Sequence, residues 1–134
     1  VTPEEVVGPP RPGRRLVYTG DTRPCEETVE AARDADLLIH EATFGDEEED
    51  RAADTGHSTA RQAAKVARDA GVRSLALTHF SARYSEQAHR LGREASSVFA
   101  DTVVAEDGLT VEIPYRDQDA EVTAHGPVRA GGRR

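Results

Sequence analysis

The sequence predicts an α/β domain whose first part is a mostly parallel sheet. Three short apolar runs, around residues 15–19, 36–40 and 73–78, have the length of buried strands. Segments with helical spacing of apolar residues separate these runs, and the connections between them are short. Because strands that alternate with helices form layered parallel sheets, the expected order is strand, helix, strand, helix, strand, helix and a final hairpin.

The first elements are bounded by clear turn signals. Residues 1–13 contain four prolines and two glycines, so we expect an opening loop. Residues 15–19 are expected to form a short buried strand, and Thr22 to cap a helix that runs to about Arg33. Residues 36–40 are expected to form a strand covered on both faces. The side chains expected to face inward from the helix are Val29, Ala32 and Ala31.

A long acidic run and a well-marked helix come next. Residues 45–54 contain five consecutive acids, which favours a solvated loop. Thr59 and Gln62 have the spacing of a capping box, and Gly71 closes the helix that follows. Residues 73–78 are expected to form the third strand of the sheet.

The last elements are shorter. Ser85 is expected to open a helix whose inward residues are Ala88, Leu91, Ala95, Val98 and Phe99. Residues 102–105 and 109–113 are expected to pair as a hairpin, because Asp-Gly at 107–108 is a strong turn signal. Residues 116–134 have no pattern, so we expect one domain over 1–115 followed by a disordered tail.

Composition limits the class of protein. The chain has 134 residues, a net charge of −8 and a single lysine, Lys65. This acidic, arginine-rich balance suits a cytoplasm with high salt or a GC-rich coding sequence, and it does not by itself indicate a nucleic-acid binder. The single Cys25 excludes an internal disulfide and a cysteine-rich zinc site, and favours a reducing, cytoplasmic location. No segment has the pattern of a signal peptide or a membrane span.

Polar side chains follow three strands of the predicted sheet. Asp21 follows the first strand, His40 and Glu41 end the second, and His79 follows the third, while His57 precedes a helix. Because the carboxyl ends of parallel strands share one edge, where ligands collect, these groups are expected to converge. One aspartate, one glutamate and up to three histidines there indicate a metal or acid/base site.

Each of these residues also has a structural interpretation. Asp21 would serve in a turn or a helix cap, and His40 would be a hydrogen-bonded core histidine. Glu41 would pair with an arginine such as Arg61 or Arg83. The other histidines have interpretations as a cap, a sheet-edge residue or surface residues: His57, His79, His89 and His125. Only the shared position at one edge favours chemistry.

Four motifs nevertheless resemble a known family. They are Tyr-Thr-Gly-Asp-Thr-Arg-Pro at 18–24, Leu-Ile-His-Glu-Ala-Thr-Phe at 38–44, Gly-His-Ser-Thr-Ala at 56–60 and Thr-His-Phe-Ser-Ala-Arg-Tyr at 78–84. In sequence and order, these motifs resemble the C-terminal half of the ribonuclease Z family, which are tRNA 3′-processing endonucleases. The resemblance covers roughly residues 2–115 and implies the C-terminal half of a metallo-β-lactamase αββα sandwich.

The resemblance also implies roles for individual residues. Asp21 and His79 match ligands of a site for two Zn²⁺ ions, and Glu41 and His57 match a pair implicated in proton transfer to the leaving 3′ oxygen. The residues implied to shape the site and touch substrate phosphate are Arg83 and Thr59. The implied substrate is precursor tRNA, cut to leave a 3′ hydroxyl, and the implied assembly is a cytoplasmic homodimer with no membrane partner.

The main metal motif of this family, His-x-His-x-Asp-His, is missing from the sequence. Two protein ligands are too few for two zinc ions, so the sequence predicts a fragment that folds poorly and is inactive alone. Two alternatives stay open. One is a non-catalytic half-domain that pairs with a separate N-terminal half, and the other is a different metallo-β-lactamase-fold hydrolase acting on a small ester or another phosphodiester.

Overall fold

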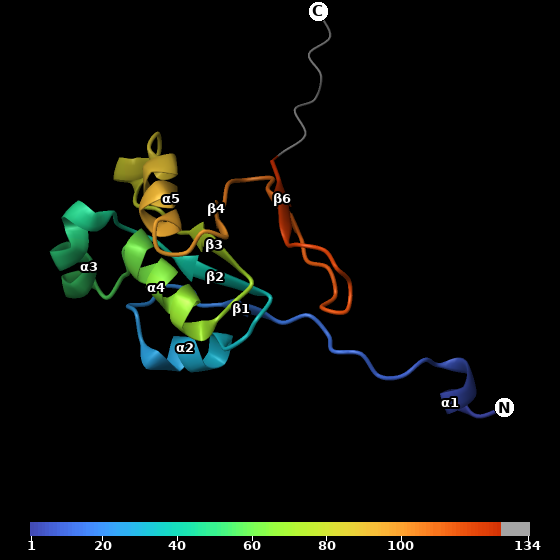
Figure 1. Ribbon diagram of the computed structural model, residues 1–134. Coiled ribbons are helices and arrows are strands. Elements are labelled where there is room, and N and C mark those ends of the chain that lie inside the picture. Colours follow the sequence, from blue (N-terminus) through green and yellow to red (C-terminus); the bar gives the residue numbers. More distant parts are fainter. Residues whose placement is uncertain (127–134) are drawn as a thin grey trace, which may run out of the picture.

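The computed structural model describes residues 1–126, and its centre is a four-stranded parallel sheet with helices on one face (Figure 1). The strands lie side by side in sequence order, each parallel to the next. Their bounds are β1 Leu16–Tyr18, β2 Leu37–Glu41, β3 Ser74–Thr78 and β4 Thr102–Val104. The predicted α/β class and parallel sheet are confirmed.

Four α-helices lie in the connections between successive strands of the sheet: α2 after β1, α3 and α4 after β2, and α5 after β3. Right-handed crossovers between strands in sequence order place every connecting helix on the same face. From this face Leu38, Leu75 and Leu77 are fully buried in the core, against the alanine-rich side of α4. The helices and short 3₁₀ turns are α1 Pro3–Val6, α2 Glu26–Ala32, η1 Asp46–Glu48, α3 Glu49–Thr55, α4 Ala60–Ala70, η2 Ala82–Tyr84 and α5 Ala88–Ser96.

The opposite face of the sheet is open at β1. Leu16 and Tyr18 are 55% and 71% exposed, whereas Leu37 and Ala76 on the same face are buried. The expectation of a buried first strand is therefore wrong, because β1 is an edge strand covered only on the helical side. A sheet with helices on one face is one half of an αββα sandwich, as the resemblance implies.

The N-terminal elements differ in detail from the expectation. The opening loop contains α1, since Pro3 occupies its first turn and Glu5 accepts a hydrogen bond from the Thr2 backbone N–H at 2.7 Å. Thr22 does not cap α2, which starts after Cys25. The inward positions of Val29 and Ala32 are confirmed, but Ala31 is exposed.

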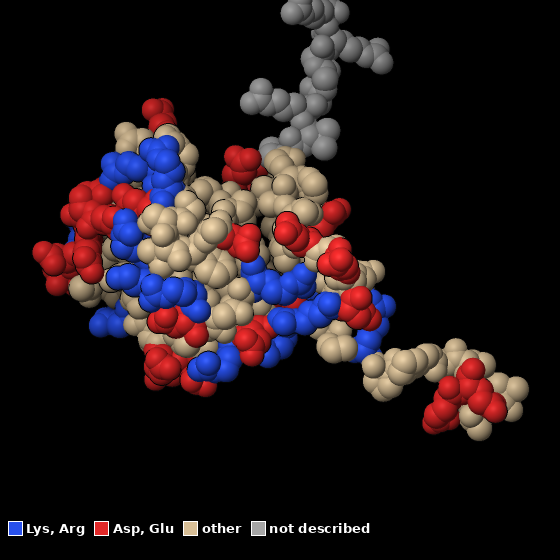
Figure 2. Space-filling model, in the orientation of Figure 1, with Lys and Arg blue, Asp and Glu red and all other residues tan. Residues whose placement is uncertain are grey.

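The acidic run is folded, contrary to the expected loop. Its residues form η1 and α3, and acids in a first helical turn interact favourably with the helix dipole. Successive acids also pair with arginines from three other elements. The pairs are Asp46 with Arg61, Glu47 with Arg90 and Glu48 with Arg83. Figure 2 shows acids gathered over α3 with arginines beside them, so ion pairing offsets the repulsion.

The C-terminal strands pair differently from the predicted hairpin. Strand β4 extends the parallel sheet, and β5, Thr110–Glu112, pairs antiparallel with β6, Thr123–His125. The chain still turns at Gly108, where φ is +84°. The predicted tail therefore contains a strand, and its residues 127–134 lie outside the described part of the chain.

The last helix is also shifted. Helix α5 starts at Ala88 rather than at Ser85, because residues 82–84 form a separate 3₁₀ turn. Leu91 and Ala95 are buried as expected. Val98 and Phe99 follow the end of α5 but still pack against the core.

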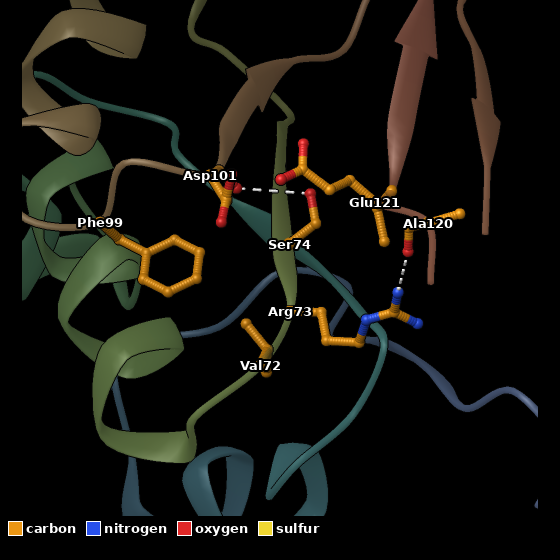
Figure 3. Close-up of a pocket in the computed structure, with 8 residues that line it drawn as sticks. Val72, Arg73, Ser74, Phe99, Asp101, Ala120 and Glu121 are labelled. Carbon is orange, nitrogen blue, oxygen red and sulfur yellow. Dashed lines mark hydrogen bonds between the residues drawn. The ribbon is translucent and has the colours of Figure 1, made fainter. Parts of the chain in front are cut away.

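A pocket of about 330 Å³ lies at the amino-terminal edge of the sheet (Figure 3). Arg73 donates a hydrogen bond to the Ala120 carbonyl at 3.0 Å, and the Ser74 hydroxyl donates to the Asp101 carbonyl at 3.3 Å. The first contact ties the segment before β6 to the sheet, and the second ties the start of β3 to the residue before β4. The pocket is therefore at the opposite edge from the motif residues.

Asp36 should make the stability of the chain sensitive to acid. Burial acts to raise the pKa of this carboxyl, but hydrogen bonds from Arg73 and from the Arg15 backbone lower it below its ordinary range. The Arg116 guanidinium acts in the same direction. A lowered pKa contributes stability that is complete above the unfolded pKa and is lost as pH falls through the folded one.

We therefore expect the free energy of unfolding to fall below about pH 4, and Asp36→Asn to flatten that dependence. Urea unfolding at a series of pH values measures it. An unchanged slope in the variant would show that other carboxyls carry the effect.

Candidate active site

The four motifs meet at the carboxyl edge of the sheet. Asp21 lies three residues after β1, Glu41 is the last residue of β2, and His79 directly follows β3. His57 lies in the turn between α3 and α4, and its backbone N–H donates to the Ala52 carbonyl at 2.9 Å. The parallel order of the strands brings Asp21, Glu41 and His79 to one edge, as expected, and the α3–α4 turn adds His57.

Glu41 is a buried carboxylate at the centre of this cluster. Its side chain is 1% exposed and accepts five hydrogen bonds. Burial acts to raise the pKa of Glu41, but bonds from Thr43, His57 and the Ser58 backbone lower it below its ordinary range. Glu41 is therefore ionised and acts only as an acceptor.

His57 is held by this carboxylate. Its Nδ1 lies 2.7 Å from Glu41 Oε1, so Nδ1 carries a hydrogen. The His57 ring stacks on His79 with centroids 5.4 Å apart, and Phe44 packs edge-on at 6.1 Å. A carboxylate in this position orients the imidazole, so His57 Nε2 is free to exchange a proton.

Asp21 and His79 form the outer part of the site. Their side chains are 61% and 47% exposed, and His79 Nε2 lies 3.3 Å from Asp21 Oδ1. His79 Nδ1 is already bonded to Thr43 Oγ1 at 2.9 Å. A neutral His79 with its hydrogen on Nδ1 presents the lone pair of Nε2 to the Asp21 carboxylate, so both groups offer lone pairs to a metal cation. This donor set fits a metal ion.

The ligand atoms of Glu41, His57 and His79 also lie within 4.8 Å of one another, close enough to hold a metal ion. The oxygens of Glu41 are occupied by five donors, whereas Asp21 and His79 present accessible ligand atoms. The ligand atoms of Asp21 and His79 are therefore more accessible than those of Glu41.

The remaining candidates lie around this cluster. Arg83 pairs with Glu48 and is stacked 5.9 Å from the centre of the Phe44 ring, with 40% of its side chain exposed. Thr59 is buried and caps α4 through its hydroxyl. The Thr59 hydroxyl therefore has a structural role at the start of α4.

The other histidines have structural positions. His40 is fully buried, and its Nδ1 lies 2.8 Å from the Glu41 carbonyl oxygen, while Nε2 has no partner within residues 1–126. Burial lowers the pKa of His40 despite the opposing effect of the Glu41 carbonyl and charge. His40 is thus a core residue, and His89 and His125 are exposed as expected.

Thr43 has no role in the sequence-based predictions, although its hydroxyl lies within 3.2 Å of polar atoms of three of the site residues. The available signal was its position two residues after Glu41. A residue so close to the end of β2 lies at the same edge of the sheet as the Glu41 carboxylate.

Thr59→Ala is expected to lower the free energy of unfolding by about 1 kcal/mol. Its hydroxyl accepts a hydrogen bond from the Gln62 backbone N–H at 3.1 Å, and the Thr59 backbone N–H donates in return to Gln62 Oε1 at 2.9 Å. Urea denaturation of the variant measures the loss. Thr59→Ser keeps the cap and serves as the control, and an equal loss in both variants would assign the effect to the methyl group.

The carboxyl edge of a parallel sheet is where ligands bind in open α/β folds, and the Asp and His side chains gathered there are of the types that bind metal ions or transfer protons. Residues 6–80, more than half of the chain, match the family described as the Beta-lactamase superfamily domain. The chain therefore belongs to the β-lactamase superfamily.

Individual relatives point to one group within this superfamily. Ribonuclease Z of Haloferax volcanii is 60% identical over 120 residues, which is 89% of this chain and 38% of that protein. Ribonuclease Z of Halobacterium salinarum is 59% identical over 119 residues, 89% of this chain and 39% of that protein. The crystal structure of the human short-form tRNase Z has a TM-score of 0.58 at 36% identity, covering 76% of this chain and 34% of that one. The resemblance to ribonuclease Z is confirmed.

The chain thus spans about two fifths of the length of the ribonuclease Z relatives it matches. Within the described residues, no helix is both long enough and apolar enough to cross a membrane.

Proposed function

We propose that this chain supplies the C-terminal part of the active site of a zinc-dependent endoribonuclease that removes 3′ trailers from precursor tRNA. The observation that carries the proposal is the buried Glu41–His57 pair beside the more exposed Asp21–His79 pair. The similarity to ribonucleases Z supports the substrate class. A cytoplasmic homodimer is proposed from the same resemblance.

Asp21 and His79 would hold metal in this proposal. A pair of Zn²⁺ ions, when bound, supplies water activation and neutralises charge on a phosphodiester. Two ligands do not complete such a site, so further ligands would come from the part of the family fold that this chain does not match. The isolated chain is therefore expected to be inactive.

His57 and Arg83 would act on the substrate itself. Glu41 holds His57 through Nδ1, so the protonated ring can donate from Nε2 to the leaving 3′ oxygen. Arg83 lies beside Phe44 and would exchange Glu48 for a substrate phosphate. Thr59 would shape the site by holding the start of α4. Arg23 and Arg83, the arginines near the motifs, would supply local positive charge for the substrate in a chain with a net charge of −8.

A non-catalytic half-domain is a second candidate. The exposed Leu16 and Tyr18 on the open face of β1 favour pairing with another layer of structure. In this alternative the chain would contribute to assembly and not to chemistry.

A chimeric protein separates these proposals. The matching segment of Halobacterium salinarum ribonuclease Z is replaced by this chain, to which it is 59% identical. Cleavage of a precursor tRNA with a 3′ trailer is then measured beside a small phosphodiester. Cleavage after the discriminator base supports the proposal, and a folded, metal-loaded chimera that cleaves only the small ester contradicts it. A folded chimera without either activity supports the half-domain.

A further inference from the structure

We propose that Thr43 is a positioning residue whose hydroxyl fixes the tautomer of His79, so that the lone pair of His79 Nε2 faces Asp21. The inference deepens the proposed function, but the tautomer is a property of the chain itself and can be measured without cleavage. Three contacts of one hydroxyl group carry the argument.

The single hydrogen of the Thr43 hydroxyl has one destination. Thr43 Oγ1 lies 2.7 Å from Glu41 Oε2, and Glu41 also accepts from the Thr43 and Ser58 backbone N–H groups at 3.1 Å each. An ionised carboxylate offers no hydrogen. The Thr43 hydroxyl must therefore donate to Glu41.

Toward the two histidines the Thr43 oxygen can only accept. His57 Nδ1 is 2.7 Å from Glu41 but 3.2 Å from Thr43, so its hydrogen belongs to the carboxylate. His79 Nδ1 is 2.9 Å from Thr43 Oγ1, which leaves this oxygen as the acceptor for a hydrogen on His79 Nδ1. A neutral ring with its hydrogen on Nδ1 has its lone pair on Nε2.

The backbone of Thr43 holds the same loop. Its carbonyl accepts a hydrogen bond from the Ser81 N–H at 2.9 Å, two residues after His79. His79 itself has a φ of +59°, a left-handed conformation that is uncommon for a residue with a side chain. Backbone and side-chain bonds from Thr43 thus fix both the loop and the ring, and a partner on the far nitrogen is how proteins orient a ligating histidine.

Nitrogen-15 NMR of the metal-free chain tests the inference, because two-bond couplings in the imidazole ring show which nitrogen carries the hydrogen. The spectra are recorded at a pH where His79 is neutral. We expect the Nδ1–H form of His79 in the unmodified chain and in Thr43→Ser. In Thr43→Val, which replaces the hydroxyl with a methyl group of similar size, we expect a shift toward the Nε2–H form.

The same spectra contain their own controls. His57 should keep its Nδ1–H form in all variants, because Glu41 still accepts that hydrogen, and this signal reports an intact site. Ser58→Ala removes a neighbouring hydroxyl, which donates to the Thr22 carbonyl at 2.7 Å, and should leave His79 unchanged. An Nε2–H form of His79 in the unmodified chain overturns the inference. So does an unchanged tautomer in Thr43→Val with His57 intact.

Discussion

Glu41→Gln is expected to lower the free energy of unfolding of the chain by about 3–5 kcal/mol, the range for removing one partner of a buried charged network. The carboxylate accepts hydrogen bonds from five donors on three separate loops. A glutamine amide has nearly the same shape, but its NH₂ group would face donors and leave them unpaired. Urea denaturation followed by circular dichroism measures the difference.

Glu30→Gln is the matched control for this experiment. Glu30 is also a glutamate in an ion pair, with Arg33, but its side chain is 61% exposed. Exposed pairs contribute little to stability, so this substitution should leave the unfolding midpoint nearly unchanged. Equal effects of the two substitutions would contradict the central role of Glu41 in joining the loops.

His57→Ala is expected to slow cleavage by the chimeric enzyme by about 10²–10⁴-fold, the usual contribution of a positioned general acid. Its metal content should stay near normal, because His57 bonds to Glu41 through Nδ1, whereas Asp21 and His79 are the proposed metal ligands. Asp21→Ala should instead remove metal and activity together. Single-turnover cleavage and metal content measured on the same preparations separate the two roles.

His89→Ala is the control for the loss of an imidazole, since His89 is exposed on α5 and lies outside the cluster. It should change neither activity nor metal content. If His57→Ala emptied the site of metal, the assignment of His57 to proton transfer would be wrong.

Local sequence patterns predict several elements of the fold. Thr59, Gln62 and Gly71 mark both ends of α4, where the capping box and the left-handed Gly71 are found. The apolar runs mark β2 and β3 to within one residue. Caps and periodicity are readable because they depend on neighbours only a few residues away.

The sequence predicts which residues meet at the site, but it does not predict the hydrogen bonds that join them. The parallel order places Asp21, Glu41 and His79 at one edge, and the motifs add His57. The hydroxyl of Thr43, which joins them, has no such signature, because its partners come from loops 14 and 36 residues further along the chain.

The sequence alone determined the alternation of strands β1 to β4 with helices α2, α4 and α5, the family resemblance and the residues that converge, since all of these follow from local pattern and from motif identity. The tertiary structure decided which strands pair, because β5 could reach β6 as well as β4, and the choice depends on the whole sheet. It also decided that the acidic run is helical, since the arginines that neutralise Asp46, Glu47 and Glu48 come from α4, α5 and η2. Contacts between distant segments form only when the chain is folded, and they set the charge, burial and proton positions on which the site depends.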